Sequence, residues 1–279
     1  MELGMYSIEL HRPTVESLFE AIKSYGFTNV QFDFLSVCDE EMPRNIESDL
    51  AKRIRDAADS NGVKIVSVNG TFNMIDPDPE IRADGLLRFE ELARHMHELG
   101  CRFVTLCTGS RSKESMWRYH PDNQTEEAWL DLLSTMRLVL DIAEKYDLIL
   151  GLETEPNNVM NTAELCRKLI EHFDNTPRLQ VIMDIANLFR PGMAHPENVQ
   201  PTMRHAFDLL SDRVYLAHGK DIMESDEVHC TYAGNGIVDF KYFRELLENI
   251  GYSGCMLIHG LHAEEEFPKA LKFIREIFD

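Results

Sequence analysis

The sequence predicts a single-domain α/β protein, a (β/α)₈ TIM barrel over residues 1–279, on three observations. Eight short apolar runs alternate with amphipathic helical stretches along the chain. The first apolar run is not followed by the G-x-G-x-x-G turn of a doubly wound sheet. No linker or low-complexity segment divides the 279 residues, a length that suits one large barrel domain.

The eight predicted strands are short and apolar, as expected for parallel strands that are buried on both faces. They cover residues 3–8, 28–34, 63–69, 102–107, 148–153, 179–184, 213–218 and 254–259. The loops after the strands at 102–107 and 213–218 are long. Loops of this length in a compact domain are commonly functional, and both would lie at the carboxyl-terminal face of the barrel.

The predicted helices are marked by capping residues. Thr14, Thr125 and Thr162 each stand at a helix start, whereas Gly62 and Gly100 follow helix ends. The first helix begins near Thr14 and a last helix closes the chain. The others cover about 46–61, 80–99, 125–146, 162–173, 197–210 and 240–249.

Composition narrows the class of partner. The net charge is −20 and the hydrophobic fraction is 44%, so the protein has a substantial core and a surface that repels nucleic acid and anionic lipid. There is no apolar run of membrane-spanning length and no signal-peptide pattern. Six cysteines without C-x-x-C spacing indicate reduced thiols in a cytoplasmic protein. We expect a small-molecule substrate, and a homo-oligomer formed through outer helices is compatible with a barrel.

The stretch 148–184 organises the candidate site. Two apolar runs, joined by a helix that starts at Thr162, end in the carboxylates Glu153 and Asp184. A strand-helix-strand unit of this kind is parallel, so both carboxylates would stand side by side at the face where α/β folds place their chemistry. Unpaired acids at buried strand ends are costly, which favours a cation between them.

Two histidines extend this pattern. His218 and His259 end the next two strands, so four consecutive strands supply Glu153, Asp184, His218 and His259. A histidine or an acid alone at a strand end is more often a structural residue or a helix cap, but four together favour one divalent metal ion. Mixed carboxylate and imidazole ligands suit Mn²⁺, Fe²⁺, Co²⁺ or Zn²⁺ better than Mg²⁺ or Ca²⁺.

Five segments carry a resemblance to a known family: GLETEP, MDIANLF, YLAHGKD, GNGIVDF and GYSGCMLIH. In this order the chain resembles the xylose isomerase-like TIM-barrel superfamily, whose members are often labelled sugar phosphate isomerases or epimerases. The resemblance aligns Glu153, Asp184 and His218 with the family's metal-binding Glu, Asp and His, and Lys220 with its lysine. It departs at Asn187, where members often have His, and at His259, where they commonly have Glu.

The resemblance implies a metal-dependent isomerase or epimerase of a small keto sugar or sugar phosphate, acting through a metal-stabilised enediolate. We expect Glu153 or His259 to be the base and Lys220 to hold the developing oxyanion. The departure at His259 places a symmetric two-glutamate epimerisation in doubt. A lyase that dehydrates a keto-inositol or keto sugar is the alternative. An endonuclease IV-like hydrolase is disfavoured because its additional histidine ligands are replaced by Asn69 and Cys107, and a sugar-binding barrel without catalysis also remains open.

Further residues at the predicted barrel mouth are candidates for substrate binding. Aromatic and basic side chains in the long loops suit a sugar face and an anionic group, although each could equally be a core or solvated residue. The candidates are Asn69, Phe72, Arg111, Trp117, Glu155 and Asn187.

Overall fold

The computed structural model describes residues 1–278 and shows the closed eight-stranded parallel barrel that the sequence predicts. Neighbouring strands pair in parallel in the order β6-β5-β4-β3-β2-β1-β9-β7, and a pairing between β6 and β7 closes the ring. The barrel strands are β1 Leu3–Tyr6, β2 Asn29–Phe32, β3 Lys64–Asn69, β4 Phe103–Leu106, β5 Ile149–Glu153, β6 Leu179–Asp184, β7 Val214–Ile222 and β9 Met256–Ile258.

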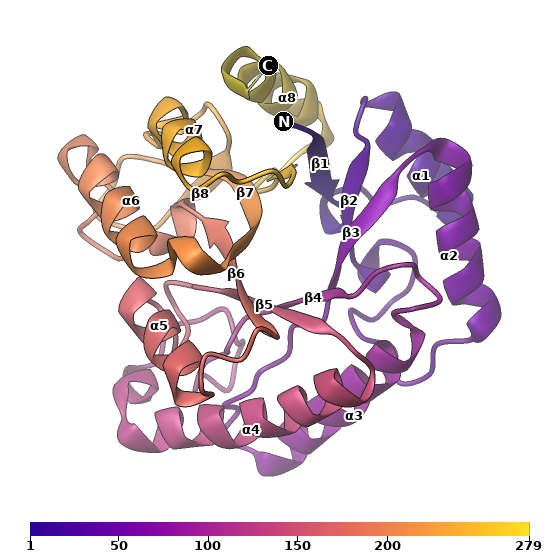
Figure 1. The fold of residues 1–279 in the computed structure, drawn as a ribbon, viewed down its shortest axis with the longest axis horizontal. Coiled ribbons are helices and arrows are strands. Elements are labelled where there is room, and N and C mark those ends of the chain that lie inside the picture. Colours follow the sequence, from indigo (N-terminus) through magenta and orange to yellow (C-terminus); the bar gives the residue numbers. More distant parts are fainter. Residues whose placement is uncertain (279) are drawn as a thin grey trace.

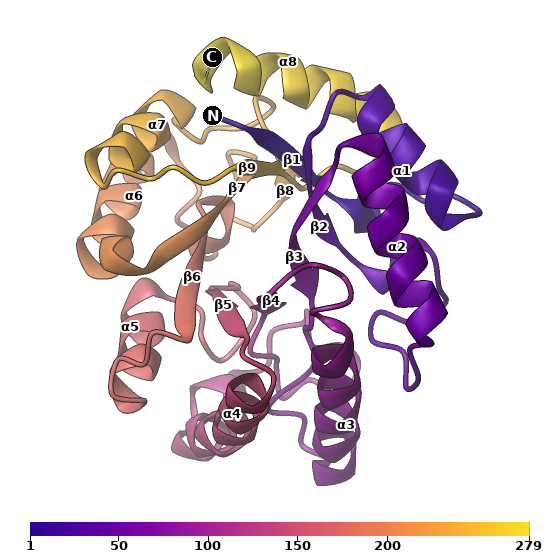
Figure 2. The ribbon, with the colours of Figure 1, turned by 45° about the vertical axis from the view of Figure 1, so that its right-hand side comes forward.

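Eight α-helices in residues 1–278 surround the strands, as Figures 1 and 2 show. They are α1 Val15–Ser24, α2 Ser48–Asn61, α3 Pro79–His95, α4 Glu126–Lys145, α5 Ala163–His172, α6 Pro196–Leu210, α7 Phe240–Asn249 and α8 Phe267–Phe278. Each buries one apolar stripe against the barrel and leaves its other side to solvent.

The capping residues that the sequence indicates do begin these helices. The side chains of Thr14, Thr125 and Thr162 each accept a hydrogen bond from a backbone N–H in the first turn of α1, α4 and α5. Gly62, directly after α2, has a φ of +66°, a left-handed conformation that glycine adopts without steric strain.

Two stacked aromatic rings lie at the amino-terminal end of the barrel. Phe103 of β4 and Tyr215 of β7 stack with their ring centroids 4.4 Å apart. Gly151 of β5 makes room for these rings, because a Cβ atom there would lie 2.4 Å from the Phe103 ring. Since alternate residues of a strand share a face, Glu153 points into the same interior two positions further on, toward the open end.

One predicted loop contains a strand. The prediction ends a strand at 218 and treats 219–239 as irregular, but β7 continues to Ile222 and pairs antiparallel with β8 (Cys230–Tyr232). The cause is local: residues 220–222 extend past the barrel rim, where the returning chain satisfies their backbone groups. Lys220 belongs to this hairpin, in register with Tyr232, and its side chain is buried.

The first residue of the chain lies against the end of α8. The Met1 amino group lies 3.4 Å from the carbonyl oxygen of Phe278 in α8, next to β1 (Figure 1). The barrel lies within residues 1–278, and Asp279, the last residue of the predicted domain over 1–279, lies outside the described residues. Across 1–278, every helix is too short or too polar to cross a bilayer.

Candidate active site

Three of the four predicted metal ligands form one cluster. Glu153, Asp184 and His218 end or continue β5, β6 and β7, and each offers a ligand atom within 4.8 Å of the others. Asp184 and His218 are direct partners in the β6–β7 register. All three side chains are buried. The parallel register of neighbouring strands therefore brings these side chains to one level.

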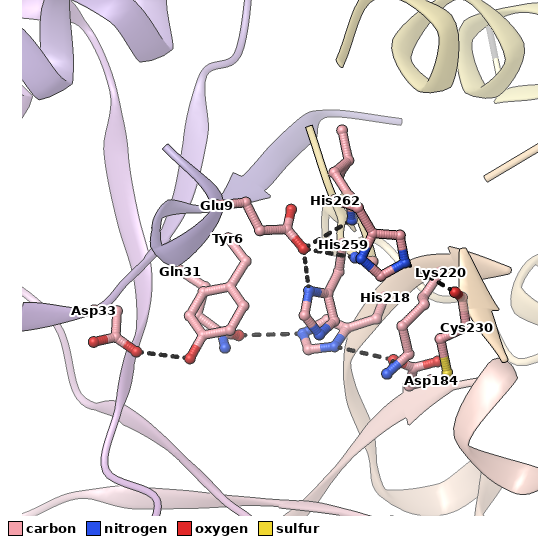
Figure 3. A network of polar contacts seen from close by, with 12 residues as sticks. Tyr6, Glu9, Gln31, Asp33, Asp184, His218, Lys220, Cys230, His259 and His262 are labelled. Carbon is pink, nitrogen blue, oxygen red and sulfur yellow. Dashed lines mark hydrogen bonds and ion pairs between the residues drawn. The ribbon is translucent and has the colours of Figure 1, made fainter. Parts of the chain in front are cut away.

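The orientation of His218 is set from across the barrel (Figure 3). Its Nε2 lies 3.1 Å from the side-chain carbonyl oxygen of Gln31 on β2. An amide oxygen only accepts hydrogen bonds, so Nε2 carries a proton whether or not Nδ1 also carries one. Nδ1 lies 3.3 Å from Glu153 Oε1 and 3.6 Å from Asp184 Oδ2. Nδ1 is therefore the ring nitrogen that faces the two carboxylates and that could bind a metal ion after losing its proton.

The cluster attracts positive charge. Burial by itself lowers the pKa of His218, but Glu153 and Asp184 outweigh burial and raise it to about 9. Burial likewise lowers the pKa of Lys220, whose Nζ lies 3.1 Å from Asp184 Oδ2, and that carboxylate raises it well above its usual value. Burial raises the pKa of Asp184, yet Lys220 and His218 hold it below its usual range.

A divalent cation fits the unsatisfied atoms of this cluster. His218 Nδ1 and Asn187 Oδ1 are buried and make no hydrogen bond within residues 1–278, and the buried Asp184 Oδ2 has only ion-pair contacts, with Lys220 Nζ at 3.1 Å and His218 Nδ1 at 3.6 Å. Buried polar atoms are normally satisfied, and a carboxylate oxygen beside an imidazole lone pair is a donor set for a transition-metal ion. Asn187 Nδ2 also donates to Glu153 Oε1 at 2.8 Å. We therefore assign Glu153, Asp184 and His218 as the residues that would hold the ion.

His259, the fourth predicted ligand, stands beside the cluster rather than in it. Its ring packs edge-to-face on His218 with centroids 5.6 Å apart. Its Nδ1 lies 2.8 Å from Oε1 of Glu9, which follows β1 (Figure 3). The carboxylate accepts a hydrogen bond from Nδ1–H, so Nε2 is the ring nitrogen that has no hydrogen-bond partner among the described residues.

A cavity of about 270 Å³ opens over the cluster, near the small end of the range for ligand pockets, which begins at about 300 Å³. It contains four of the six predicted substrate-binding residues: Asn69, Trp117, Glu155 and Asn187. The predicted catalytic residues Glu153, Lys220 and His259 also line it. Burial and the charges of Glu153 and Asp184 raise the pKa of Glu155 to about 7, against the opposing effect of Lys220.

The other two predicted substrate-binding residues point elsewhere. Arg111 is buried with its Nη2 2.7 Å from an Asp131 carboxylate oxygen of α4, and its Nη1 donates to the Ile75 carbonyl. Phe72 packs against Gly85 and Phe89 of α3. Neither lines the cavity, because the backbone of each loop turns the side chain toward the outer helices.

Several residues in or beside the cavity were not predicted to be part of the site. Gln31 could be recognised only as a polar residue near a strand end, and its contact with His218 joins strands that are far apart in the sequence. Glu9 and Glu41 lie in short connecting segments that carry no motif. Tyr6 ends β1 and its hydroxyl donates to Asp33 at 2.7 Å, a contact that no local pattern indicates.

The model of the xylose isomerase-like TIM barrel family matches residues 19–277. The chain belongs to this family. Its curated relatives include L-ribulose-5-phosphate 3-epimerase UlaE of Shigella flexneri serotype 5b (strain 8401), which is 24% identical over 276 residues, covering 96% of this chain and 90% of the relative.

Solved structures agree with this fold assignment. A D-tagatose 3-epimerase-like protein superposes with a TM-score of 0.78 at 19% identity, covering 99% of this chain and 97% of that one. The IOLI protein, solved with a zinc atom, superposes with a TM-score of 0.70 at 14% identity, covering 99% and 96%. At these identities the likeness establishes the fold of this family member, and its function is argued from the site.

Proposed function

We propose that this member of the xylose isomerase-like family is a divalent-metal-dependent epimerase or isomerase of a small keto sugar. The buried Glu153–Asp184–His218 cluster with its unsatisfied ligand atoms is the observation that carries the proposal. The names of the L-ribulose-5-phosphate and D-tagatose relatives support sugar epimerisation as the reaction class. A hydrolase of the three-metal type is not supported, since residues 1–278 supply one such cluster.

The ion would supply charge stabilisation: it would polarise the substrate carbonyl and lower the cost of removing the proton from the neighbouring carbon. Asp184 and His218 have their ligand atoms oriented for this by Lys220 and Gln31. Because both lie beneath the cavity and are almost inaccessible to water, their role is to hold the ion rather than to touch the sugar.

Glu153 is placed to exchange the proton. Its Oε1 accepts the hydrogen bond from Asn187 Nδ2, and the side chain lines the cavity. Oε2 is therefore the atom that would take the proton from the substrate carbon. His259, which also lines the cavity, would supply the returning proton from Nε2 of its doubly protonated ring, with Glu9 holding the ring at Nδ1. Return to the opposite face of the same carbon gives an epimer. Glu153 then ends protonated and His259 neutral, and proton exchange with water restores both.

The test is proton exchange in heavy water. The protein, loaded with the metal that elemental analysis finds in it, is incubated with a panel of keto sugars, and NMR follows deuterium at the carbon next to the carbonyl. We expect deuterium incorporation together with an epimer or isomer, and loss of both by at least about a hundredfold in Glu153→Gln, the usual scale of general base catalysis.

Glu164→Gln is the matched control, because Glu164 is an exposed glutamate of α5 that pairs with His205. Its activity should equal that of the wild type. Deuterium exchange that persists in Glu153→Gln would remove Glu153 as the base. A product that has lost water would show that the enzyme is a lyase and contradict the proposed reaction.

A further inference from the structure

We propose that the cavity selects an uncharged sugar and rejects sugar phosphates, an inference that rests on the proposed function and narrows its substrate class. TIM barrels commonly bind a substrate phosphate with backbone N–H groups in the loops after the seventh and eighth strands and at the start of a short extra helix. All three places exist here, and each already holds a carboxylate of the chain itself.

After the seventh barrel strand, the backbone N–H groups of the loop are bonded to the carboxylate of Asp221. Its Oδ1 accepts from the backbone N–H groups of Ile222 and Val238 at 2.8 and 2.9 Å. Its Oδ2 accepts from Gly234 and Gly236, both at 3.0 Å. Asp221 is buried. Four N–H donors of the kind that would surround a phosphate are thus already bonded to a carboxylate.

After the eighth barrel strand, the backbone N–H groups of the loop are bonded to the carboxylate of Glu9. Its Oε1 accepts from the backbone N–H groups of Gly260 at 2.7 Å and Leu261 at 3.1 Å, in addition to the His259 ring (Figure 3). Its other oxygen is buried without a partner. A phosphate could reach these donors only by displacing a buried carboxylate.

The short extra helix is capped in the same way. It spans Glu264–Glu266, and Glu266 Oε2 accepts from the backbone N–H groups of His262 and Ala263 at 2.8 and 3.3 Å. Its three residues are all acidic. This segment therefore repels an anion instead of attracting one.

Basic side chains do not compensate. Among the described residues, the cavity lining includes Lys220 and His259 and no arginine. Lys220 is paired with Asp184, and His259 with Glu9. The two arginines of the loop after β4 are also paired with carboxylates, Arg111 with Asp131 and Arg118 with Glu114. The lining has no basic group that is free to neutralise a phosphate.

The wall at Glu41 is acidic. Glu41 is half-buried and lines the cavity. Burial, and then the nearby charge of Asp33, raises the pKa of Glu41. A carboxylate here accepts hydrogen bonds from sugar hydroxyls, whereas a phosphate brought against it would meet a like charge. Trp117, 45% exposed, offers an aromatic face for the C–H side of a sugar ring or chain.

The experiment separates binding from turnover. Keto sugars are reduced to alditols, which cannot epimerise by this route, and calorimetry compares each alditol with its terminal phosphate ester on the metal-loaded protein. We expect at least one uncharged alditol to bind, with its phosphate ester weaker by at least about tenfold, since like charges placed together cost several kcal/mol. The same preference should appear in deuterium exchange with the parent sugars.

Glu41→Gln should reduce the discrimination against the phosphate ester several-fold. Glu47→Gln, an exposed glutamate of the same connection, should leave it unchanged. Tighter binding of the phosphate ester, or no binding of any uncharged alditol, would overturn the inference. Binding of an uncharged alditol without any proton exchange on keto sugars would support the inference and overturn the proposed function. Proton exchange on sugar phosphates alone would support the proposed reaction and overturn the inference.

Discussion

At the scale of single residues, the site depends on side chains that orient the ligands. The Gln31 side-chain oxygen, which also accepts from Ser67 Oγ at 3.2 Å, fixes which nitrogen of His218 carries the proton. Partners of this kind raise the basicity of a ligand and hold its ring, and losing one typically lowers metal affinity by about 10- to 100-fold. Gln31 therefore contributes to binding of the proposed ion without touching it.

We predict that Gln31→Met lowers the affinity for the divalent ion by about 10- to 100-fold, because a thioether fills similar space without accepting the Nε2 proton well. Competition with a chromophoric chelator measures this. Gln31→Glu is the control, since it restores an acceptor at the same position and should bind the ion at least as well as Met. Equal affinity for the wild type and Gln31→Met would show that the proton position on His218 is set by something else.

The cluster could be anticipated from sequence because each of its members sits at the end of a strand. Glu153, Asp184 and His218 are separated by helices, but parallel pairing forces strand ends to one face. Arg111 could not be placed in this way, since its loop is long and only the folded backbone shows that Asp131 takes its guanidinium. The partner of His259 was equally hidden, because Glu9 lies 250 positions earlier.

At the scale of elements, the sequence predicted the helix caps but did not predict the hairpin at the barrel rim. A threonine before an amphipathic run predicts a helix start from one residue and its immediate neighbours. The hairpin between β7 and β8 depends instead on three residues at Cys230–Tyr232 that carry no alternating pattern. Its existence follows from the unpaired backbone beyond the barrel rim, which sequence periodicity does not report.

We predict that Thr162→Ala lowers the free energy of unfolding by about 1 kcal/mol, the usual cost of losing an N-cap. Thr162 Oγ1 accepts from the Leu165 N–H at 3.2 Å and begins α5. Urea unfolding at neutral pH measures the change. Thr162→Ser keeps the acceptor and should cost much less. An equal loss in both variants would mean that the threonine methyl group, and not the cap, is what stabilises this helix.

At the scale of the whole molecule, the barrel core contains a set of ionisable groups that it keeps neutral. All six cysteines are free, and four of them are buried, as the absence of C-x-x-C spacing predicts. Burial raises the pKa of Cys101 to about 11 and those of Cys166 and Cys255 to about 12. These three thiols belong to the packed core, away from the Glu153–Asp184–His218 cluster.

The sign of the resulting pH dependence follows from proton binding. An unfolded thiol has a pKa of about 8.5, so between this value and the folded pKa the native state binds more protons than the unfolded state. Stability then falls as pH rises. The contribution of each thiol is fully present below about pH 8.5, and it is lost at up to about 1.4 kcal/mol per pH unit as the pH approaches the folded pKa.

We therefore predict that the free energy of unfolding, measured in urea from pH 7 to pH 10, falls more steeply above pH 8.5 in the wild type than in Cys166→Ala. The variant lacks the Cys166 thiol of α5. It therefore has one group fewer whose proton binding makes the free energy of unfolding depend on pH. Ile170→Val removes a methyl group from the same buried face without an ionisable group. It should lower stability by about 1 kcal/mol equally at every pH. Parallel curves for the wild type and Cys166→Ala would show that this thiol has the same pKa in both states, and that the helix opens before its core titrates.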